Sequence, residues 1–290
     1  MKYYEVNFTI TAPESIRQDV ADVLMALVAD AGFETFQSTD DGFTGYVQQS
    51  QLQQPVLDAL VAQLPFDGVA VNYEVVEADH RDWNEQWEQE GFAPVTVGRD
   101  CVVHDGRHIN GVCLEEFRCA VEIDAHLAFG TGNHETTRLM IASLTKLSLN
   151  GTRVLDCGCG TGILGIVALK LGAQQAVGYD IDEWSADNAR HNAVINGVEH
   201  AYVPLLGDAS VLDSVAGLFD VVVANINRNI LLADMPTLRS RMKTGGHLLI
   251  SGFYSADRDT LVKRATDLGL QLYGERTDGD WMCLAFTLSS

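Results

Sequence analysis

Residues 153–163 read RVLDCGCGTGI, a short apolar run followed by an acidic residue and closely spaced glycines. The apolar run predicts a buried strand, and the apolar residues over 163–171 predict a helix. Glycines at such a strand-to-helix turn, here Gly158, Gly160 and Gly162, let a ligand approach the backbone at a helix N-terminus. The stretch therefore predicts an α/β sheet with a small-molecule site at its carboxyl edge.

The next predicted strand lies within QAVGYDID, residues 175–182, and carries an acidic residue at its carboxyl end. Asp180 lies 22 residues after Gly158, where a carboxylate can accept hydrogen bonds from both ribose hydroxyls of a nucleoside. Two cofactors fit such a site, S-adenosylmethionine and a nicotinamide dinucleotide. The first would make the protein a methyltransferase, and the second gives the alternative function, an NAD-dependent oxidoreductase. The glycines that match the dinucleotide fingerprint are Gly160, Gly162 and Gly165.

Asp156, near the end of the first predicted strand, favours S-adenosylmethionine. A pyrophosphate at this position would be repelled by the carboxylate. The sulfonium and ammonium groups of S-adenosylmethionine are cations, so the same carboxylate becomes favourable, either directly or through water. A second acid, Asp208, follows the predicted third strand and either accepts from the adenine amino group or is a surface turn residue.

The fourth predicted strand, DVVVANIN at residues 220–227, ends in Asn225 at the carboxyl edge of the sheet. Methyl transfer is an in-line displacement that needs a neutral amine aimed at the methyl carbon, so positioning carries most of the catalysis. The amide oxygen of Asn225 can accept a hydrogen bond from the amine without adding a charge that would favour the unreactive ammonium. No separate base is evident, and we expect the amine to lose its proton to solvent.

Residues 125–144, AHLAFGTGNHETTRLMIASL, predict a lid loop followed by a helix. Gly130 and Gly132 give the loop flexibility, and Asn133 is the predicted N-cap of the helix.

The histidines predict no metal site. His134 and Glu135 do not form a zinc motif, because residue 138 is Arg where a second histidine is required. His104 and His108 show no ligand spacing with an acid or a thiol, and we assign both to a surface loop.

Residues 1–78 show strand and helix patterns in the order βαββαβ. This order predicts a ferredoxin-like α+β domain, a superfold that indicates a small recognition module. Residues 1–80 carry 13 acidic residues against Lys2 and Arg17. An acidic module of this kind is either merely soluble or captures a basic partner.

Residues 79–94 predict a linker helix, and residues 95–290 the second domain. Near the end of the chain, residues 270–288 form two alternating runs around an Asp-Gly turn and predict a hairpin. A seven-stranded, Rossmann-like sheet with a reversed last strand is the hallmark of the class I methyltransferases, whereas a dinucleotide fold more often continues parallel.

The composition excludes several classes of protein. The chain has 19 Lys and Arg residues against 40 Asp and Glu residues, a net charge of −21, which would repel a phosphate backbone, so we expect no direct nucleic-acid binding. No apolar run approaches the ~18 to 20 residues that span a bilayer, and the first residues alternate like a strand. We therefore expect a cytoplasmic protein that does not bind membranes.

The chain resembles the ribosomal protein methyltransferases of the PrmA family, which modify large-subunit ribosomal protein eleven. The resemblance spans nearly the whole chain and is most specific in four stretches. These are AFGTGNHETT (128–137), VLDCGCGTGILGIVALKLGA (154–173), GYDID (178–182) and VVVANI (221–226). The segment DWNEQW (82–87) also resembles the linker of the family.

This resemblance implies a division of labour between the two domains. The acidic ferredoxin-like domain would bind the basic ribosomal protein, and the linker would reposition it. The class I S-adenosylmethionine-dependent domain would transfer methyl groups to lysine side chains and to the N-terminal α-amine of that protein. The alternative is a methyltransferase of another basic protein. We expect this enzyme to be a monomer.

The resemblance also implies the cofactor contacts. Carried over by position, they fall on Thr137, Gly158, Asp180 and Asn225, all of which are present. Asn133 departs from the family, which usually has Thr or His before the histidine.

Overall fold

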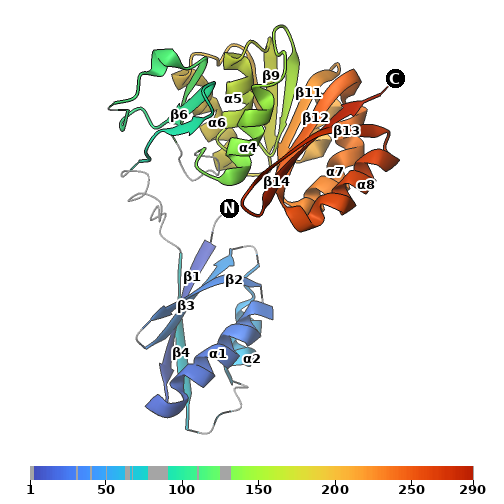
Figure 1. Cartoon of the computed structure of the whole chain (residues 1–290). Helices are drawn as coiled ribbons and strands as arrows, with labels where there is room; N and C mark the ends of the chain where they lie inside the picture. The colour runs from blue at the N-terminus through green and yellow to red at the C-terminus, as the bar shows by residue number, and fades with distance from the viewer. Residues whose placement is uncertain are drawn as a thin grey trace. The chain divides into compact units, whose positions relative to one another are not determined.

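The computed structural model describes residues 3–30, 32–39, 41–49, 51–62, 66, 68–77, 91–109, 111–124 and 132–289. The chain divides into two compact units, Met1–Asp82 and Trp83–Ser290 (Figure 1). Each unit has a hydrophobic core of its own. Most of the predicted linker helix over 79–94 lies outside the described residues, and residues 91–94 at its end belong to neither a helix nor a strand.

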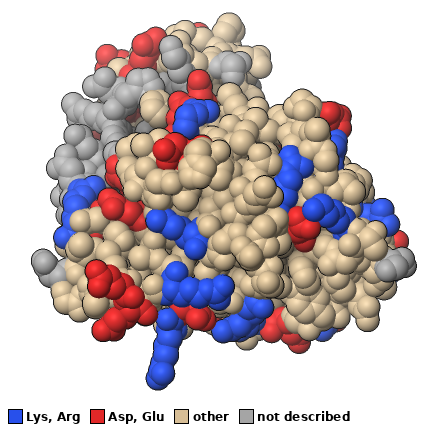
Figure 2. All heavy atoms as spheres, turned by 90° about the horizontal axis from the view of Figure 1, so that it is seen from above, with Lys and Arg blue, Asp and Glu red and all other residues tan. Residues whose placement is uncertain are grey.

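The face of the molecule drawn in Figure 2 carries charged residues of both signs, with Lys and Arg scattered among Asp, Glu and uncharged residues. Interspersed charges of this kind are typical of a solvated surface. Within the described part of the chain, no helix has the length and apolar character needed to span a membrane.

The first unit has the predicted element order. Its elements are β1 (Tyr3–Thr11), α1 (Glu14–Asp30), β2 (Phe33–Thr39), β3 (Gly42–Gln48), α2 (Gln54–Ala62) and β4 (Ala70–Glu77). The sheet order is β2-β3-β1-β4 and neighbouring strands are antiparallel, which is the split β-α-β arrangement. The period of two along β1 buries Val6, Phe8 and Ile10 in one cluster with Val20 and Leu24 of α1.

The second unit contains two sheets. Its elements are β5 (Val95–Val97), β6 (Cys101–His104), η1 (Leu114–Glu116), β7 (Cys119–Glu122), α4 (Glu135–Leu144), β8 (Arg153–Cys157), α5 (Ile163–Lys170), β9 (Gln175–Asp180), α6 (Glu183–Ile195), β10 (Tyr202–Leu206), η2 (Ala209–Ser214), β11 (Phe219–Asn225), α7 (Arg228–Ser240), β12 (Met242–Tyr254), η3 (Ser255–Asp257), α8 (Arg258–Asp267), β13 (Leu270–Asp278) and β14 (Trp281–Leu288). The main sheet has the order β10-β9-β8-β11-β12-β14-β13, and the small sheet has the order β5-β6-β7.

The main sheet is the predicted seven-stranded sheet with a reversed last strand. The strands from β10 to β12 pair in parallel, and β14 is antiparallel to both β12 and β13. The predicted hairpin near the end of the chain is formed by β13 and β14. These findings confirm the sheet that the sequence predicts.

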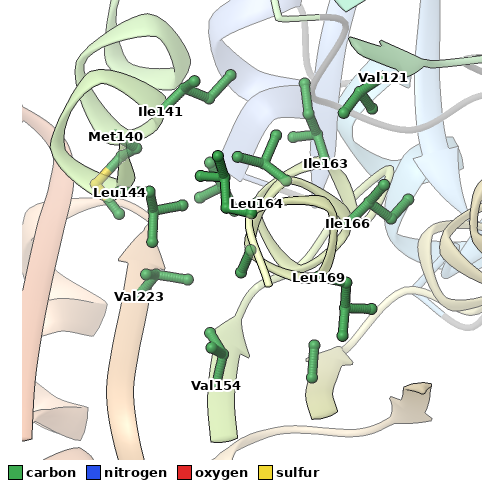
Figure 3. Packing of buried hydrophobic residues seen from close by; sticks show 14 of the residues in the cluster. Val121, Met140, Ile141, Leu144, Val154, Ile163, Leu164, Ile166, Leu169 and Val223 are labelled. Atoms are coloured by element: carbon green, nitrogen blue, oxygen red, sulfur yellow. The ribbon is translucent and has the colours of Figure 1, made fainter. Parts of the chain in front are cut away.

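Helices cover both faces of the main sheet (Figure 1). Helices α4, α5 and α6 share a core cluster with one face, and α7 and α8 share a cluster with the other. Leu144 of α4 and Ile166 of α5 lie in the first cluster with Val154 of β8 and Val223 of β11 (Figure 3). Alternate residues of the same strands, such as Leu155, point into the second cluster, because successive side chains of a strand point to opposite faces.

Three asparagines spaced four residues apart on α6 and at its C-cap attach the small sheet to the main one. Asn196 pairs with the backbone of Glu122, where Nδ2 donates to the carbonyl at 2.6 Å and Oδ1 accepts from the amide at 3.0 Å. The Oδ1 of Asn192 accepts from the amide of Asp124 at 2.9 Å, and the Nδ2 of Asn188 donates to its carbonyl at 2.8 Å. The spacing of four places all three on one helix face, so this asparagine ladder fixes the backbone that leads into the predicted lid.

We expect the substitution Asn196→Ala to lower the free energy of unfolding by about 2 to 3 kcal/mol, because it leaves the amide and carbonyl of Glu122 without partners. Asn150, which is exposed, offers a matched control, and Asn150→Ala should change stability by less than about 0.5 kcal/mol. Urea denaturation measures both. Equal effects of the two substitutions would show that the ladder does not stabilise the fold.

Candidate functional site

The carboxyl ends of the parallel strands meet at one edge of the main sheet, where the predicted site residues lie. Asp180 ends β9, Asn225 ends β11, and Gly158 directly follows β8. Val223 points to the side of the sheet that α4 and α5 cover. The period of two along β11 therefore directs Asn225 to that side as well.

The glycines of the loop after β8 adopt left-handed backbone conformations. The φ angle is +65° at Gly158, +51° at Gly160 and +79° at Gly162, a region that favours glycine. A Cβ atom on Gly158 would overlap the Cγ2 atom of Ile226. Both the backbone conformation and the available space therefore require glycine, and the loop can present bare backbone to a ligand.

Asp180 connects β9 to this glycine loop. Its Oδ2 accepts a hydrogen bond from the amide of Gly160 at 2.9 Å, and its Oδ1 accepts one from the amide of Asp182 at 3.1 Å. These bonds orient the carboxylate, and each oxygen keeps further acceptor capacity. A half-buried carboxylate held in this way can accept from a pair of ribose hydroxyls.

Asp156 is buried at the base of the glycine loop. Its side chain is buried beneath α5, and its Oδ2 accepts from the amide of Gly165 at 2.9 Å. Burial raises the pKa of Asp156 to about 7. The negative charge of Asp180 also raises this pKa, and the hydrogen bond from the Gly165 amide lowers it. The residue therefore anchors α5 to β8.

Gly165, the third glycine of the dinucleotide fingerprint, makes room for Tyr202 of β10. A Cβ atom on Gly165 would overlap the ring of Tyr202, and one on Gly178 of β9 would overlap its hydroxyl group. Tyr202 is itself buried. The third glycine of the fingerprint therefore reflects the packing of α5 on the sheet. The spacing of the glycines could not reveal Tyr202 as their neighbour, because Tyr202 belongs to a later strand.

Asn225 and Thr137 come together from elements that are 88 residues apart in the chain. The Nδ2 of Asn225 lies 3.5 Å from the Oγ1 of Thr137, which is buried in the first turn of α4. Among the described residues, the buried Oδ1 of Asn225 has no hydrogen-bond partner. A buried acceptor without a partner costs free energy, so this oxygen is a candidate acceptor for a hydrogen bond from a ligand.

Asp208 lies beside Asp180 but is exposed. The amide of Gly207 donates to the backbone carbonyl of Asp180 at 2.8 Å. The carboxylate of Asp208 caps η2 by accepting from the amide of Ser210 at 2.9 Å. Hydrogen bonds from the hydroxyl and amide of Ser210 lower the pKa of Asp208, which keeps the group an ionised acceptor at the rim of the site.

A family model described as ribosomal protein L11 methyltransferase (PrmA) matches residues 20–289. The chain belongs to this family. It is 40% identical over 288 residues to the ribosomal protein L11 methyltransferase of Bacteroides fragilis, covering 99% of this chain and 100% of the relative. It is 40% identical over 292 residues to that of Porphyromonas gingivalis, covering 100% and 99%. A solved structure, the ribosomal protein L11 methylase from Lactobacillus delbrueckii subsp. bulgaricus, aligns with a TM-score of 0.62 and 28% identity over 69% of this chain and 100% of that chain.

Membership in the L11 methyltransferase family confirms several predictions. The second unit has the fold of the class I methyltransferases, the enzyme is a methyltransferase, and its cofactor is S-adenosylmethionine. The alternative function, an NAD-dependent oxidoreductase, finds no support among these relatives.

In this family member the cap of α4 is His134 and not the predicted Asn133. The Nδ1 of His134 accepts from the amide of Thr136 at 3.2 Å. Asparagine is statistically the better N-cap, but here the backbone carbonyl of Asn133 accepts a hydrogen bond from the Arg138 guanidinium. Arg138 also forms an ion pair with Asp278 of β13 at 2.8 Å, which ties the start of α4 to the hairpin.

The assignment of His104 and His108 to a surface loop was wrong for His104. His104 ends β6 and is buried, and its Nδ1 accepts from the amide of Gly106 at 3.1 Å. His108 does lie in a loop, where its Nδ1 is 2.6 Å from the Oδ2 of the buried Asp105. Burial alone would raise the pKa of Asp105, but hydrogen bonds from His108 and neighbouring amides hold it well below its usual range. Both histidines therefore support the fold of the small sheet.

We expect the substitution Asp156→Asn to remove part of the pH dependence of stability. The pKa of Asp156 is about 7 in the folded chain and ~3.9 in an unfolded one, so folding favours the neutral carboxyl group. That contribution is full below about pH 4 and is lost as the pH rises through 7. Urea denaturation at about pH 5 and about pH 8 should show a smaller loss of unfolding free energy in the variant, because asparagine stays neutral and can still accept from Gly165.

The matched control for this prediction is Asp259→Asn, because the side chain of Asp259 is 93% exposed. The control removes one negative charge and should follow the wild-type pH dependence. If Asp156→Asn also follows it, the buried carboxyl group does not titrate near neutral pH.

Proposed function

We propose that this chain transfers methyl groups from S-adenosylmethionine to lysine side chains and the N-terminal α-amine of ribosomal protein L11. The observation that carries the proposal is the buried, unpartnered Oδ1 of Asn225, which calls for a hydrogen-bond donor at the carboxyl edge. An amine is such a donor. The names of the relatives, which are ribosomal protein L11 methyltransferases, support the choice of substrate.

The residues around the glycine loop fit the cofactor. In the proposed site, Asp180 accepts from the ribose hydroxyls, Gly158 and Gly160 let the ligand approach the loop, and Asp208 accepts from the adenine amino group. The hydrogen bond from Gly160 to Asp180 supports this arrangement, because it holds acid and loop together. When bound, S-adenosylmethionine supplies an electrophilic methyl carbon, whose bond to sulfur breaks with the electron pair left on sulfur as the amine nitrogen forms the new bond.

Asn225 is the proposed catalytic residue and acts by positioning. Its Oδ1 accepts an N–H of the neutral amine and aims the lone pair. Thr137 holds the amide by its contact with Nδ2 at 3.5 Å and, by family resemblance, also contacts the cofactor. The amine loses its proton to water before the transfer, and the secondary ammonium that forms loses one afterwards.

The first unit is the proposed recognition domain, residues 1–78, joined by the linker 79–94 to the catalytic domain 95–290. Its excess of acidic residues attracts a basic protein. A hollow of about 400 Å³ between α2 and β4 offers a concave surface, and Asp58 in its lining supplies a negative charge. We propose that the enzyme acts in the cytoplasm, as a monomer without direct nucleic-acid binding.

The function is tested by incubating the purified chain with S-adenosylmethionine and separately purified basic ribosomal proteins, followed by intact-mass analysis. We expect mass gains in steps of one methyl group on L11 alone. A chain that lacks residues 1–78 should still bind the cofactor in calorimetry but should not modify L11. Methylation of L11 by the truncated chain would contradict the proposed division of labour, and no mass gain on L11 with the full chain would contradict the substrate.

We expect Asn225→Ala and Asp180→Ala to separate turnover from binding. Asn225→Ala should change the affinity for S-adenosylmethionine by less than about tenfold, ~1.4 kcal/mol, yet remove most methyl transfer. Asp180→Ala should weaken cofactor binding by roughly 1.5 to 3 kcal/mol, because it removes a charged hydrogen-bond acceptor. Calorimetric titration and mass analysis of L11 give the two readouts.

Asn229→Ala is the control for Asn225, since Asn229 is an exposed asparagine four residues later at the same edge. It should leave both readouts unchanged. Wild-type turnover in Asn225→Ala would remove this residue from catalysis, and unchanged cofactor affinity in Asp180→Ala would remove Asp180 from the ribose site.

A further inference from the structure

A group of aromatic side chains stands at the same edge of the sheet as Asn225. Tyr254 ends β12, Trp281 begins β14, and the strand register pairs them directly. Their rings stack with centroids 4.3 Å apart and an angle of 29° between the planes. The ring of His134 approaches Trp281 edge-on, with centroids 4.9 Å apart. We call Tyr254, Trp281 and His134 the aromatic wall.

The aromatic wall and Asn225 lie on the same face of the sheet. Trp281 packs against the core cluster that contains Val223 of β11, which is the face to which Asn225 points. Helix α4 gives a second link, because His134 caps it and Thr137 in its first turn contacts Asn225. One helical turn rises about 5 Å, so His134 lies about one turn from Thr137 along α4.

Backbone and ion-pair contacts hold the wall in place. The amide and hydroxyl of Ser255 donate to the carbonyl of Asp280 at 2.8 and 3.0 Å, which joins the residue after Tyr254 to the residue before Trp281. The ion pair between Arg138 and Asp278 joins α4 to the same hairpin. Although one face of its ring stacks on Trp281, Tyr254 is 52% exposed, so aromatic surface remains open to an incoming group.

Successive methylation of one amine creates a requirement that Asn225 cannot meet alone. The unmethylated and monomethylated neutral amines carry N–H groups that the Oδ1 of Asn225 can accept, but a dimethylated amine carries none. In the third transfer the tertiary amine forms an N–C bond with its lone pair, the C–S bond breaks toward sulfur, and the quaternary ammonium product has no proton to release. The acceptor must then be aimed by contacts that do not need an N–H.

We propose that the aromatic wall is the subsite that positions the methylated lysine side chain for the later transfers. This inference rests on the proposed function. Aromatic faces attract ammonium and methylated ammonium groups. The attraction grows as positive charge develops on nitrogen, so it is stronger in the transition state than in the neutral amine.

The experiment compares the rates of the first, second and third methyl additions to L11 by time-resolved intact-mass analysis. In Tyr254→Ala we expect the third addition to slow by roughly five- to thirtyfold, and the first by less than about threefold. Tyr254→Phe keeps the ring and should restore the wild-type rates. Tyr273→Ala is the matched control, because Tyr273 is also half-exposed in this sheet and packs against a histidine, His247, at 5.4 Å.

The outcomes separate this inference from the proposed function. If the wild-type chain adds no methyl group to L11, the proposed function fails and the inference fails with it. If the wild type trimethylates L11 and Tyr254→Ala does so at the same three rates, the inference alone is wrong. Equal slowing of all three additions would also overturn it, because a purely structural effect does not depend on the number of methyl groups already present.

Discussion

Two acidic side chains hold the glycine loop after β8 and the helix that follows it, and the rest of the site depends on this constraint. Asp156 accepts from the amide of Gly165 in α5, and Asp180 accepts from the amide of Gly160 in the loop. The two acids come from neighbouring parallel strands, so the sheet itself sets the distance between them. Because both bonds use backbone amides, they fix the loop without occupying the surface that faces a ligand.

Helix α4 forms a second part of the site, because it brings distant parts of the chain to the end of β11. Thr137 reaches Asn225, and Arg138 reaches the hairpin through Asp278. The asparagine ladder of α6 also contacts the glycine loop. The Nδ2 of Asn192 donates to the carbonyl of Thr161 in that loop at 3.0 Å. A single network of hydrogen bonds therefore links the glycine loop to the backbone that leads into the predicted lid, and satisfied buried networks of this kind favour one rigid arrangement.

The sequence alone predicts those residues whose position follows from a local pattern. Asp180 and Asn225 stand at the ends of short apolar runs, and parallel strands bring such ends to one edge. The sequence does not reveal that Gly165 makes room for Tyr202, because this contact joins residues far apart in the chain. The sequence also does not reveal that Asp156 is buried, for a different reason. Strand-end acids can point to either face, and the helix packed above β8 decides which.

The proposed function needs negative charge in the first unit and an uncharged side chain at the reaction centre. An excess of carboxylates on the first unit attracts a basic protein over distances of about a Debye length, without taking part in the reaction. At the reaction centre a carboxylate would be harmful, because it would stabilise the ammonium and raise the pKa of the amine that must be neutral to attack. An uncharged amide at position 225 accepts a hydrogen bond without that penalty. Long-range attraction and the local requirement for a neutral nucleophile are therefore compatible, since one is met by the first unit and the other by Asn225.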